Sequence, residues 1–179
     1  MIYQLGKSPP AAGTRPIVAV SACLGGLETR YDGGHRVEPD LVTALEQVAE
    51  IWFVCPEIEA GFGVPRPTIE LRWSRNSLRV IDAHGADRSD VLHHTSRRLA
   101  RDAQSHQVVA FVGKARSPSC GAGDTPHLNE RGKPTEFGDG VLISTLRTNH
   151  PGIRIVSNEA LRSSEAILAL IKWIDETAR

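Results

Sequence analysis

The sequence predicts an α/β fold in which about four strands form a Rossmann-like parallel sheet, with an antiparallel hairpin inserted beside it. Short apolar runs rich in β-branched residues recur along the chain, and such runs are typical of strands buried on both faces. Amphipathic helical patterns separate these runs, and this strand–helix alternation indicates a parallel sheet. The 179 residues suffice for one domain with a sizeable core.

The first half of the chain supplies two of the predicted strands and the hairpin. Residues 17–21 (IVAVS) are a short apolar run, and residues 51–54 (IWFV) are the second. Between them, residues 39–50 carry apolar side chains at helical spacing. Residues 68–82 alternate and break near their middle, a pattern typical of two antiparallel strands joined by a turn.

The second half continues the alternation. Residues 89–105 and 140–149 are predicted helices, and residues 108–112 (VVAFV) and 153–157 (IRIVS) are predicted strands. Right-handed crossovers then give the strand order 2-1-3-4. A last helix begins at Ser163 or Ser164, either of which can cap it. Its predicted apolar stripe consists of Ile167, Leu168, Leu170, Ile171 and Ile174.

Two segments lack these patterns. Residues 1–16 have no continuous apolar core of the secretory type, so we expect a flexible tail before a single domain over residues 17–179. Residues 125–140 are polar and rich in Gly and Pro, which predicts a mobile loop or lid.

The composition favours a small-molecule partner. Lys and Arg together number 21, as do Asp and Glu, so no net field attracts intact nucleic acid or a membrane surface. No apolar run approaches the length of about 20 residues that a membrane-spanning helix needs. Three cysteines cannot all pair internally, and a chain without a secretory signal is expected to be cytoplasmic, where thiols stay reduced.

Each cysteine follows a different predicted strand and is flanked by Gly- or Pro-rich chain. Because ligands of open parallel sheets bind at the carboxyl ends of the strands, we expect Cys23, Cys55 and Cys120 to meet at one crevice. Their spacing fits neither a zinc knuckle nor a bacterial ferredoxin run. Soft thiolates select iron–sulfur or zinc centres, so the residues favour a metal site over three inert, buried cysteines.

Polar residues beside the cysteines are candidates for catalysis. Glu57 stands two residues after Cys55, where it could act as a general base, cap a turn or pair with Arg66. Glu59 is expected to be solvated. Ser117 opens a Ser-Pro-Ser-Cys sequence that could supply hydrogen-bond donors, or be an ordinary turn.

Two aromatic residues occupy the loops of these motifs. Tyr31 and Phe62 each offer a ring that could stack on a planar base, although structural packing is the favoured explanation for each one.

Taken together, the motifs resemble those of thiouracil desulfidases, a family long catalogued as a domain of unknown function. They are Ser-Ala-Cys-Leu-Gly at 21–25, Arg-Tyr-Asp-Gly-Gly at 30–34, Cys-Pro-Glu at 55–57, Gly-Val-Pro-Arg at 63–66 and Ser-Pro-Ser-Cys-Gly at 117–121. The resemblance extends over nearly the whole chain.

The resemblance implies that Cys23, Cys55 and Cys120 bind a 4Fe-4S cluster whose fourth iron is left for the sulfur of a thiolated pyrimidine. It also implies that Glu57 and Ser117 are catalytic. The expected reaction is a non-redox hydrolysis of thiouracil, or of its nucleoside or nucleotide, to uracil and hydrogen sulfide, a step in tRNA thionucleoside catabolism.

The residues alone leave other functions open. These are a non-catalytic iron–sulfur or sulfide carrier, a metal-free hydrolase with Cys120 as nucleophile, and a structural zinc site.

Overall fold

The computed structural model describes residues 15–177 together with residues 5, 8–10 and 13. Most of the tail predicted for residues 1–16 therefore lies outside the described residues. The elements, in chain order, are β1 (Ile17–Ser21), η1 (Ala22–Gly25), α1 (Pro39–Val48), β2 (Glu50–Val54), α2 (Pro56–Glu59), β3 (Ile69–Ser74), β4 (Ser77–Asp82), α3 (Ser89–Ser105), β5 (Val108–Gly113), β6 (Thr125–Leu128), β7 (Pro134–Gly138), α4 (Val141–Asn149), β8 (Arg154–Ser157), η2 (Asn158–Leu161) and α5 (Ser164–Thr177).

The main sheet has the strand order β2-β1-β5-β8, and its neighbouring strands are parallel. This confirms the predicted α/β class and the order 2-1-3-4. The central strand β1 is buried along its whole length. Its continuous apolar sequence follows from that position, because helices cover both faces of a parallel sheet.

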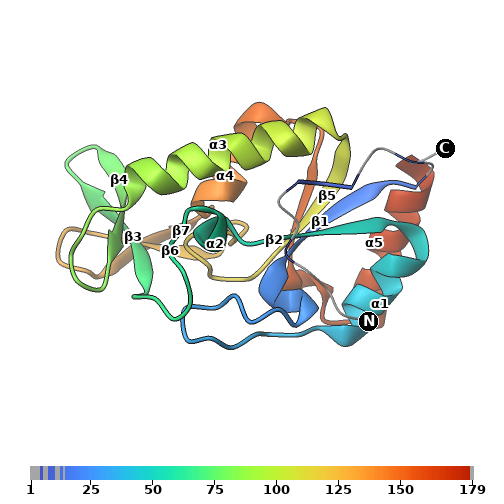
Figure 1. Ribbon diagram of the computed structural model, residues 1–179, viewed down its shortest axis with the longest axis horizontal. Coiled ribbons are helices and arrows are strands. Elements are labelled where there is room, and N and C mark those ends of the chain that lie inside the picture. The colour runs from blue at the N-terminus through green and yellow to red at the C-terminus, as the bar shows by residue number, and fades with distance from the viewer. Residues whose placement is uncertain (1–4, 6–7, 11–12, 14, 178–179) are drawn as a thin grey trace.

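Helices pack on both faces of the main sheet (Figure 1). Successive strand residues point to opposite faces, so Ala19 and Phe111 contact the core shared with α3 and α4. Val18 and Val20 contact the core shared with α1 and α5. The result is a three-layer α/β/α arrangement.

A second sheet, of order β4-β3-β6-β7, lies at the end of the molecule away from α1 and α5 (Figure 1). The predicted hairpin is its antiparallel β3–β4 pair. The prediction of a mobile loop at residues 125–140 is wrong, because β6 and β7 form a second hairpin there and β6 pairs parallel with β3. The segment is polar because β7 is an exposed edge strand, which needs no apolar face.

The 17-residue helix α3, about 25 Å long at 1.5 Å per residue, joins the two sheets. Leu92, near its amino end, packs in the core of the second sheet with Leu71. Leu99 and Ala103, toward its carboxyl end, pack against the main sheet. Helix α3 therefore links the two sheets, because its two ends pack in their separate cores.

The last helix begins as predicted, since the Ser163 hydroxyl accepts a hydrogen bond of 3.2 Å from the Ala166 amide. Leu170 and Ile174 are buried in the core, but Leu168 is 63% exposed. The prediction for Leu168 is therefore wrong. At about 100° per residue it lies roughly 200° around the helix from Leu170, on the solvent side.

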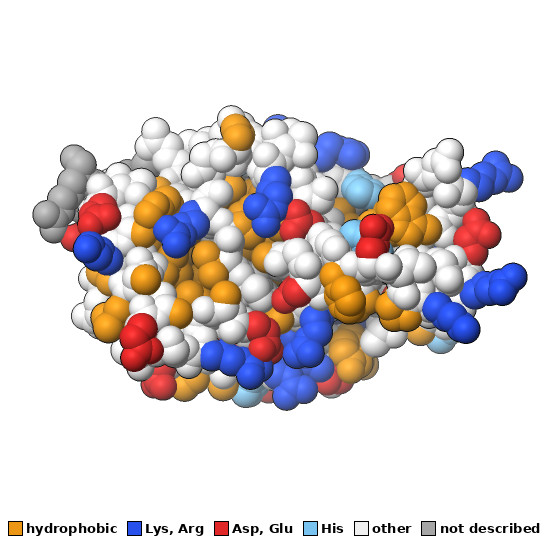
Figure 2. Space-filling view, turned by 180° about the vertical axis from the view of Figure 1, so that it is seen from behind, with side chains coloured by type: hydrophobic (Ala, Val, Ile, Leu, Met, Phe, Trp, Pro, Cys, Tyr) orange, Lys and Arg blue, Asp and Glu red, His pale blue; other side chains and the backbone are white. Residues whose placement is uncertain are grey.

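Figure 2 shows acidic and basic side chains interspersed over the face that it displays, in keeping with the formal net charge of zero. Among the described helices, none combines the length and the apolar character that crossing a membrane requires.

Candidate functional site

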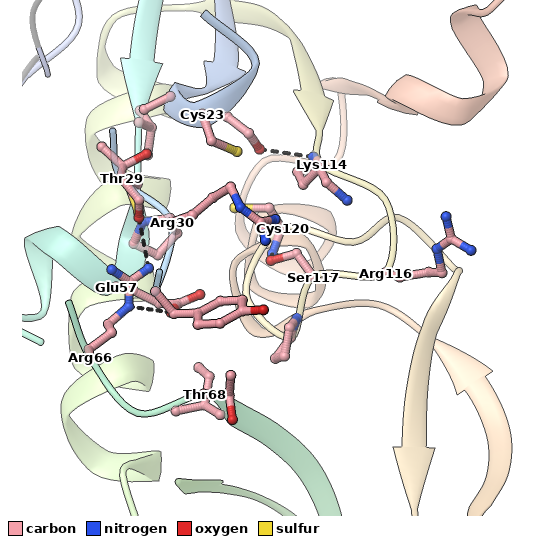
Figure 3. A pocket seen from close by; sticks show the side chains of 18 of the residues that line it. Cys23, Thr29, Arg30, Glu57, Arg66, Thr68, Lys114, Arg116, Ser117 and Cys120 are labelled. Carbon is pink, nitrogen blue, oxygen red and sulfur yellow. Dashed lines mark hydrogen bonds and ion pairs between the residues drawn. The ribbon is translucent and has the colours of Figure 1, made fainter. Parts of the chain in front are cut away.

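The three cysteines line one cavity. Strands β2, β1 and β5 are adjacent and parallel, so their carboxyl ends share one edge of the sheet. Cys23 lies in η1 after β1, Cys55 directly follows β2, and Cys120 lies in the loop after β5. All three border a cavity of about 180 Å³, and Figure 3 shows Cys23 and Cys120 beside it.

The thiols are protonated at neutral pH in the metal-free chain. Burial, with a smaller effect from Cys55, raises the pKa of Cys23 to about 11. Burial also raises the pKa of Cys55 and of Cys120. Within the described part of the chain, no group of three or more His, Cys, Asp or Glu side chains converges on the position of a single ion. The donors around this cavity include three sulfurs, which suit an iron–sulfur cluster.

These raised pKa values predict slow alkylation of the metal-free protein. The thiolate is the nucleophile, so at pH 8 iodoacetamide should modify Cys23 about 200-fold more slowly than the same cysteine in unfolded chain, whose pKa is about 8.5. The rate should keep rising beyond pH 10. The folded state favours the protonated Cys23 thiol. The contribution of this thiol to the free energy of unfolding is therefore complete below pH ~8.5 and is lost as the pH rises toward 11.

Peptide mass spectrometry after timed alkylation measures this rate, with urea-unfolded protein as the control. Equal rates in folded and unfolded protein would contradict the burial of Cys23.

The loop that carries Cys120 packs against glycines. A Cβ atom on Gly113 would lie 2.1 Å from the Cys120 carbonyl oxygen, and one on Gly140 would lie 2.7 Å from the Ser117 carbonyl oxygen. The amide of Val141, at the start of α4, donates to the Pro118 carbonyl at 2.9 Å. The backbone of this loop is therefore fixed by contacts that leave no room for side chains.

Gly113→Ala should consequently disturb the cysteine loop. We expect a loss of about 1–3 kcal/mol of unfolding free energy, typical of overpacking, and reduced iron content because Cys120 must move. Urea unfolding and iron analysis measure both. Gly152→Ala is the matched control, since a Cβ there meets no atom within 4 Å. Equal behaviour of the two variants would refute the packing argument.

Ser117 borders the same cavity, and its hydroxyl oxygen accepts hydrogen bonds from two backbone amides. These are the amides of Ser119, at 3.3 Å, and Cys120, at 3.1 Å. The hydroxyl oxygen is thereby held as an acceptor, so its own proton is left to donate elsewhere. Among the described residues, no acceptor is recorded for this proton.

Glu57 also borders the cavity, and both of its carboxylate oxygens are engaged. Oε2 accepts from Nε of Arg66 at 2.8 Å, and Oε1 accepts from Oγ of Ser119 at 2.8 Å. The pairing with Arg66 considered from the sequence is thus present beside the cavity. The expectation that Glu59 is solvated is wrong, because it pairs with Arg98 at 2.6 Å.

The structure separates the two candidate stacking residues. Tyr31 borders the cavity, with its side chain 42% exposed and the Arg30 guanidinium 5.2 Å from its ring centroid. Phe62 borders a different cavity and packs against the core of the second sheet. A planar base entering the thiol-lined cavity would therefore meet Tyr31.

The sequence patterns did not single out Ser119 as a candidate site residue. It stands in the same motif as Ser117, but it is fully buried and contacts Glu57. The available signal was its position one residue before Cys120, which alone could not show which serine faces the cavity.

The sequence of this chain is similar to that of a known protein family. The model of the family described as 2-thiouracil desulfurase matches residues 18–159. The chain belongs to this 2-thiouracil desulfurase family. The match includes every residue that borders the thiol-lined cavity, whereas α5 lies outside it.

Two individual proteins are also similar to this chain. Uncharacterized protein YbbK of Bacillus subtilis is 27% identical over 151 residues, which cover 81% of this chain and 97% of YbbK. A solved structure of the 4Fe-4S-dependent thiouracil desulfidase TudS is 28% identical, with a TM-score of 0.71. That similarity covers 87% of this chain and 98% of TudS. The similarity to TudS thus covers both sequence and fold.

Proposed function

We propose that this chain is a 4Fe-4S-dependent desulfidase that hydrolyses the C=S bond of a thiolated pyrimidine without net redox change. One observation carries the proposal: Cys23, Cys55 and Cys120, from three adjacent strand ends, line the same cavity as Glu57 and Ser117. The family match and the similarity to TudS support it.

The three cysteines would hold the cluster as thiolates. The donor set supports this assignment, because iron–sulfur clusters are bound by cysteine sulfur, and three ligands leave one iron without a protein ligand. When bound, the cluster supplies a soft Lewis acid that attracts the thiocarbonyl sulfur and polarises the C=S bond.

Glu57 would accept a proton from water, and Ser117 would donate a hydrogen bond. A carboxylate has about four acceptor positions, and Arg66 and Ser119 occupy two of those on Glu57. A free position can orient a water molecule and accept its proton. The water oxygen then forms the new C=O bond, the C–S bond breaks, and both water hydrogens leave with sulfur as hydrogen sulfide. Ser117 would donate a hydrogen bond to the reacting pyrimidine.

The substrate we propose is small. The cavity of about 180 Å³ and the absence of net charge favour a thiolated base, nucleoside or nucleotide over intact RNA. We place the enzyme in the reducing cytoplasm, where its thiols stay available for the cluster.

The test is anaerobic purification followed by an assay of hydrogen sulfide release from 2-thiouracil, 4-thiouracil and their nucleosides and monophosphates. We expect iron and acid-labile sulfide in the protein, and sulfide release only from the cluster-loaded form. A loaded protein inactive on every thiolated compound would indicate a carrier. Full activity without iron, lost on thiol alkylation, would instead indicate a cysteine hydrolase.

Ser117→Ala gives a further prediction. We expect kcat to fall about 10–100-fold, typical of losing a hydrogen bond made in the transition state, while iron content stays unchanged. Ser144→Ala, an exposed position on α4, is the control. A wild-type rate in Ser117→Ala would mean that the hydroxyl only shapes the Cys120 loop.

A further inference from the structure

The Glu57 carboxylate is held from two sides by residues of different parts of the chain. Arg66 approaches one oxygen from the segment before β3, and Ser119 approaches the other from the loop before Cys120. The Arg66 side chain is 4% exposed and that of Glu57 is 13% exposed, while Ser119 is fully buried. Both hydrogen bonds are thus shielded from solvent. Hydrogen bonds are electrostatically stronger in the protein interior than in water.

Arg66 makes more contacts than a simple ion pair needs. Besides Nε on Glu57, its Nη1 donates to the Gly63 carbonyl at 2.9 Å and its Nη2 donates to the Thr29 carbonyl at 2.8 Å. Figure 3 shows Arg66 between Glu57 and Thr29. The guanidinium is planar and rigid, so three contacts in different directions fix its position. It can therefore fix the position of the carboxylate in turn.

From this geometry we propose that Arg66 and Ser119 are positioning residues, which act on the reaction through Glu57 by fixing the plane of its carboxylate. The terminal torsion of a glutamate is otherwise broad, so an unrestrained carboxylate would point its free acceptor positions in many directions. With one hydrogen bond on each oxygen, the remaining positions keep a constant direction. This inference rests on the proposed desulfidase function and on the role of Glu57 in it.

The hydrogen bonds of Ser119 and Ser117 also show how the two serines differ. Ser119 uses its hydroxyl proton on Glu57, so that proton is not available to a substrate. The hydroxyl proton of Ser117 has no such acceptor among the described residues. The two serines of one motif therefore have different tasks: Ser117 faces the cavity, and Ser119 orients the carboxylate.

The proposal is tested with Arg66→Met, Arg66→Lys and Ser119→Ala in cluster-loaded protein. For Arg66→Met we expect kcat to fall about 10–100-fold, as for loss of a supporting hydrogen bond, with KM for 2-thiouracil within about threefold. Lysine keeps the charge, but its single nitrogen lacks the planar, rigid fork that reaches three separate acceptors, so Arg66→Lys should recover only part of the rate. Ser119→Ala, which removes a single atom, should lower kcat about 5–50-fold.

A double-mutant cycle separates positioning from a merely structural role. If Arg66 acts only through Glu57, adding Arg66→Met to Glu57→Gln should cost no further activity, because the interaction is already lost. The same should hold for Ser119→Ala in that background. Additive losses, or a fall in kcat that follows iron content, would overturn the proposal. If Arg66→Met fails to fold, Ser119→Ala and Arg66→Lys complete the same cycle.

Arg88→Met is the matched control. Arg88 pairs with the buried Asp82 at 2.8 Å and does not border the thiol-lined cavity, so this variant removes an arginine–carboxylate pair outside the site. Its kcat should equal that of the wild type.

The wild-type measurement also separates the two proposals: an inactive, loaded wild type refutes the desulfidase function. An active wild type with active Arg66→Met and Ser119→Ala variants refutes the positioning role alone.

Discussion

Cys55→Ser is expected to remove both the cluster and the activity. Cys55 directly follows β2 and, with Cys23 and Cys120, completes the set of three thiols at the cavity. Serine is a hard oxygen ligand that iron–sulfur chemistry disfavours. Altering even a residue that supports a metal ligand costs about 10–100-fold, so loss of a ligand should lower hydrogen sulfide release by at least about a hundredfold.

Iron and acid-labile sulfide analysis, with the visible absorbance of anaerobically purified protein, measures the cluster. Cys23→Ser and Cys120→Ala should behave in the same way. Ala103→Ser is the control, because it also introduces a hydroxyl at a buried position, on α3 and away from the cavity. Wild-type iron content in any of the three cysteine variants would remove that cysteine from the ligand set.

Glu57→Gln is expected to lower kcat by about 10²–10⁴-fold, the usual contribution of a general base, while the cluster stays bound. The amide cannot accept a proton from water. It also presents an N–H₂ group to one of the two donors, Arg66 or Ser119, that now contact the carboxylate. Steady-state hydrogen sulfide release per bound cluster is the measurement.

The neighbouring acid on α2 supplies the control for this prediction. Glu59 pairs with Arg98 and does not border the cavity, so Glu59→Gln should keep the wild-type kcat. An unchanged rate per cluster in Glu57→Gln would mean that the base is another group, such as a hydroxide formed in the cavity itself.

The main sheet and the meeting of the cysteines were predictable from sequence because both follow from local patterns and one topological rule. The run from Ile17 to Ser21 is apolar on both faces, which indicates a buried parallel strand. Right-handed crossovers then place the carboxyl ends of adjacent strands at one edge. No long-range information is needed for either step.

The second sheet was only half predictable. The β3–β4 hairpin has alternating residues and a short turn, whereas β6 is four residues long and contains Pro126. Its strand conformation depends on pairing with β3, for example Leu71 with His127, more than 50 residues away. Such pairing leaves no periodic signal in a polar segment.

The contacts of Glu57 were hidden for a related reason. The sequence showed that Arg66 is a candidate partner, but the spacing of Ser119 from Glu57 along the chain carried no signal. Which hydroxyl of Ser-Pro-Ser-Cys faces the cavity depends on the turn, in which the Ser117 oxygen accepts backbone amides. That turn is held by close backbone packing, which only the fold reveals.

The close packing at Gly113 and Gly140 has a consequence for engineering new substrate preferences. A library that randomises these two glycines would lose most members, because any side chain there overlaps the backbone of the Cys120 loop. Diversity is better introduced at Tyr31 and Thr68, which border the cavity and belong to other segments. Variants chosen there should accept bulkier thiolated rings without displacing any sulfur donor.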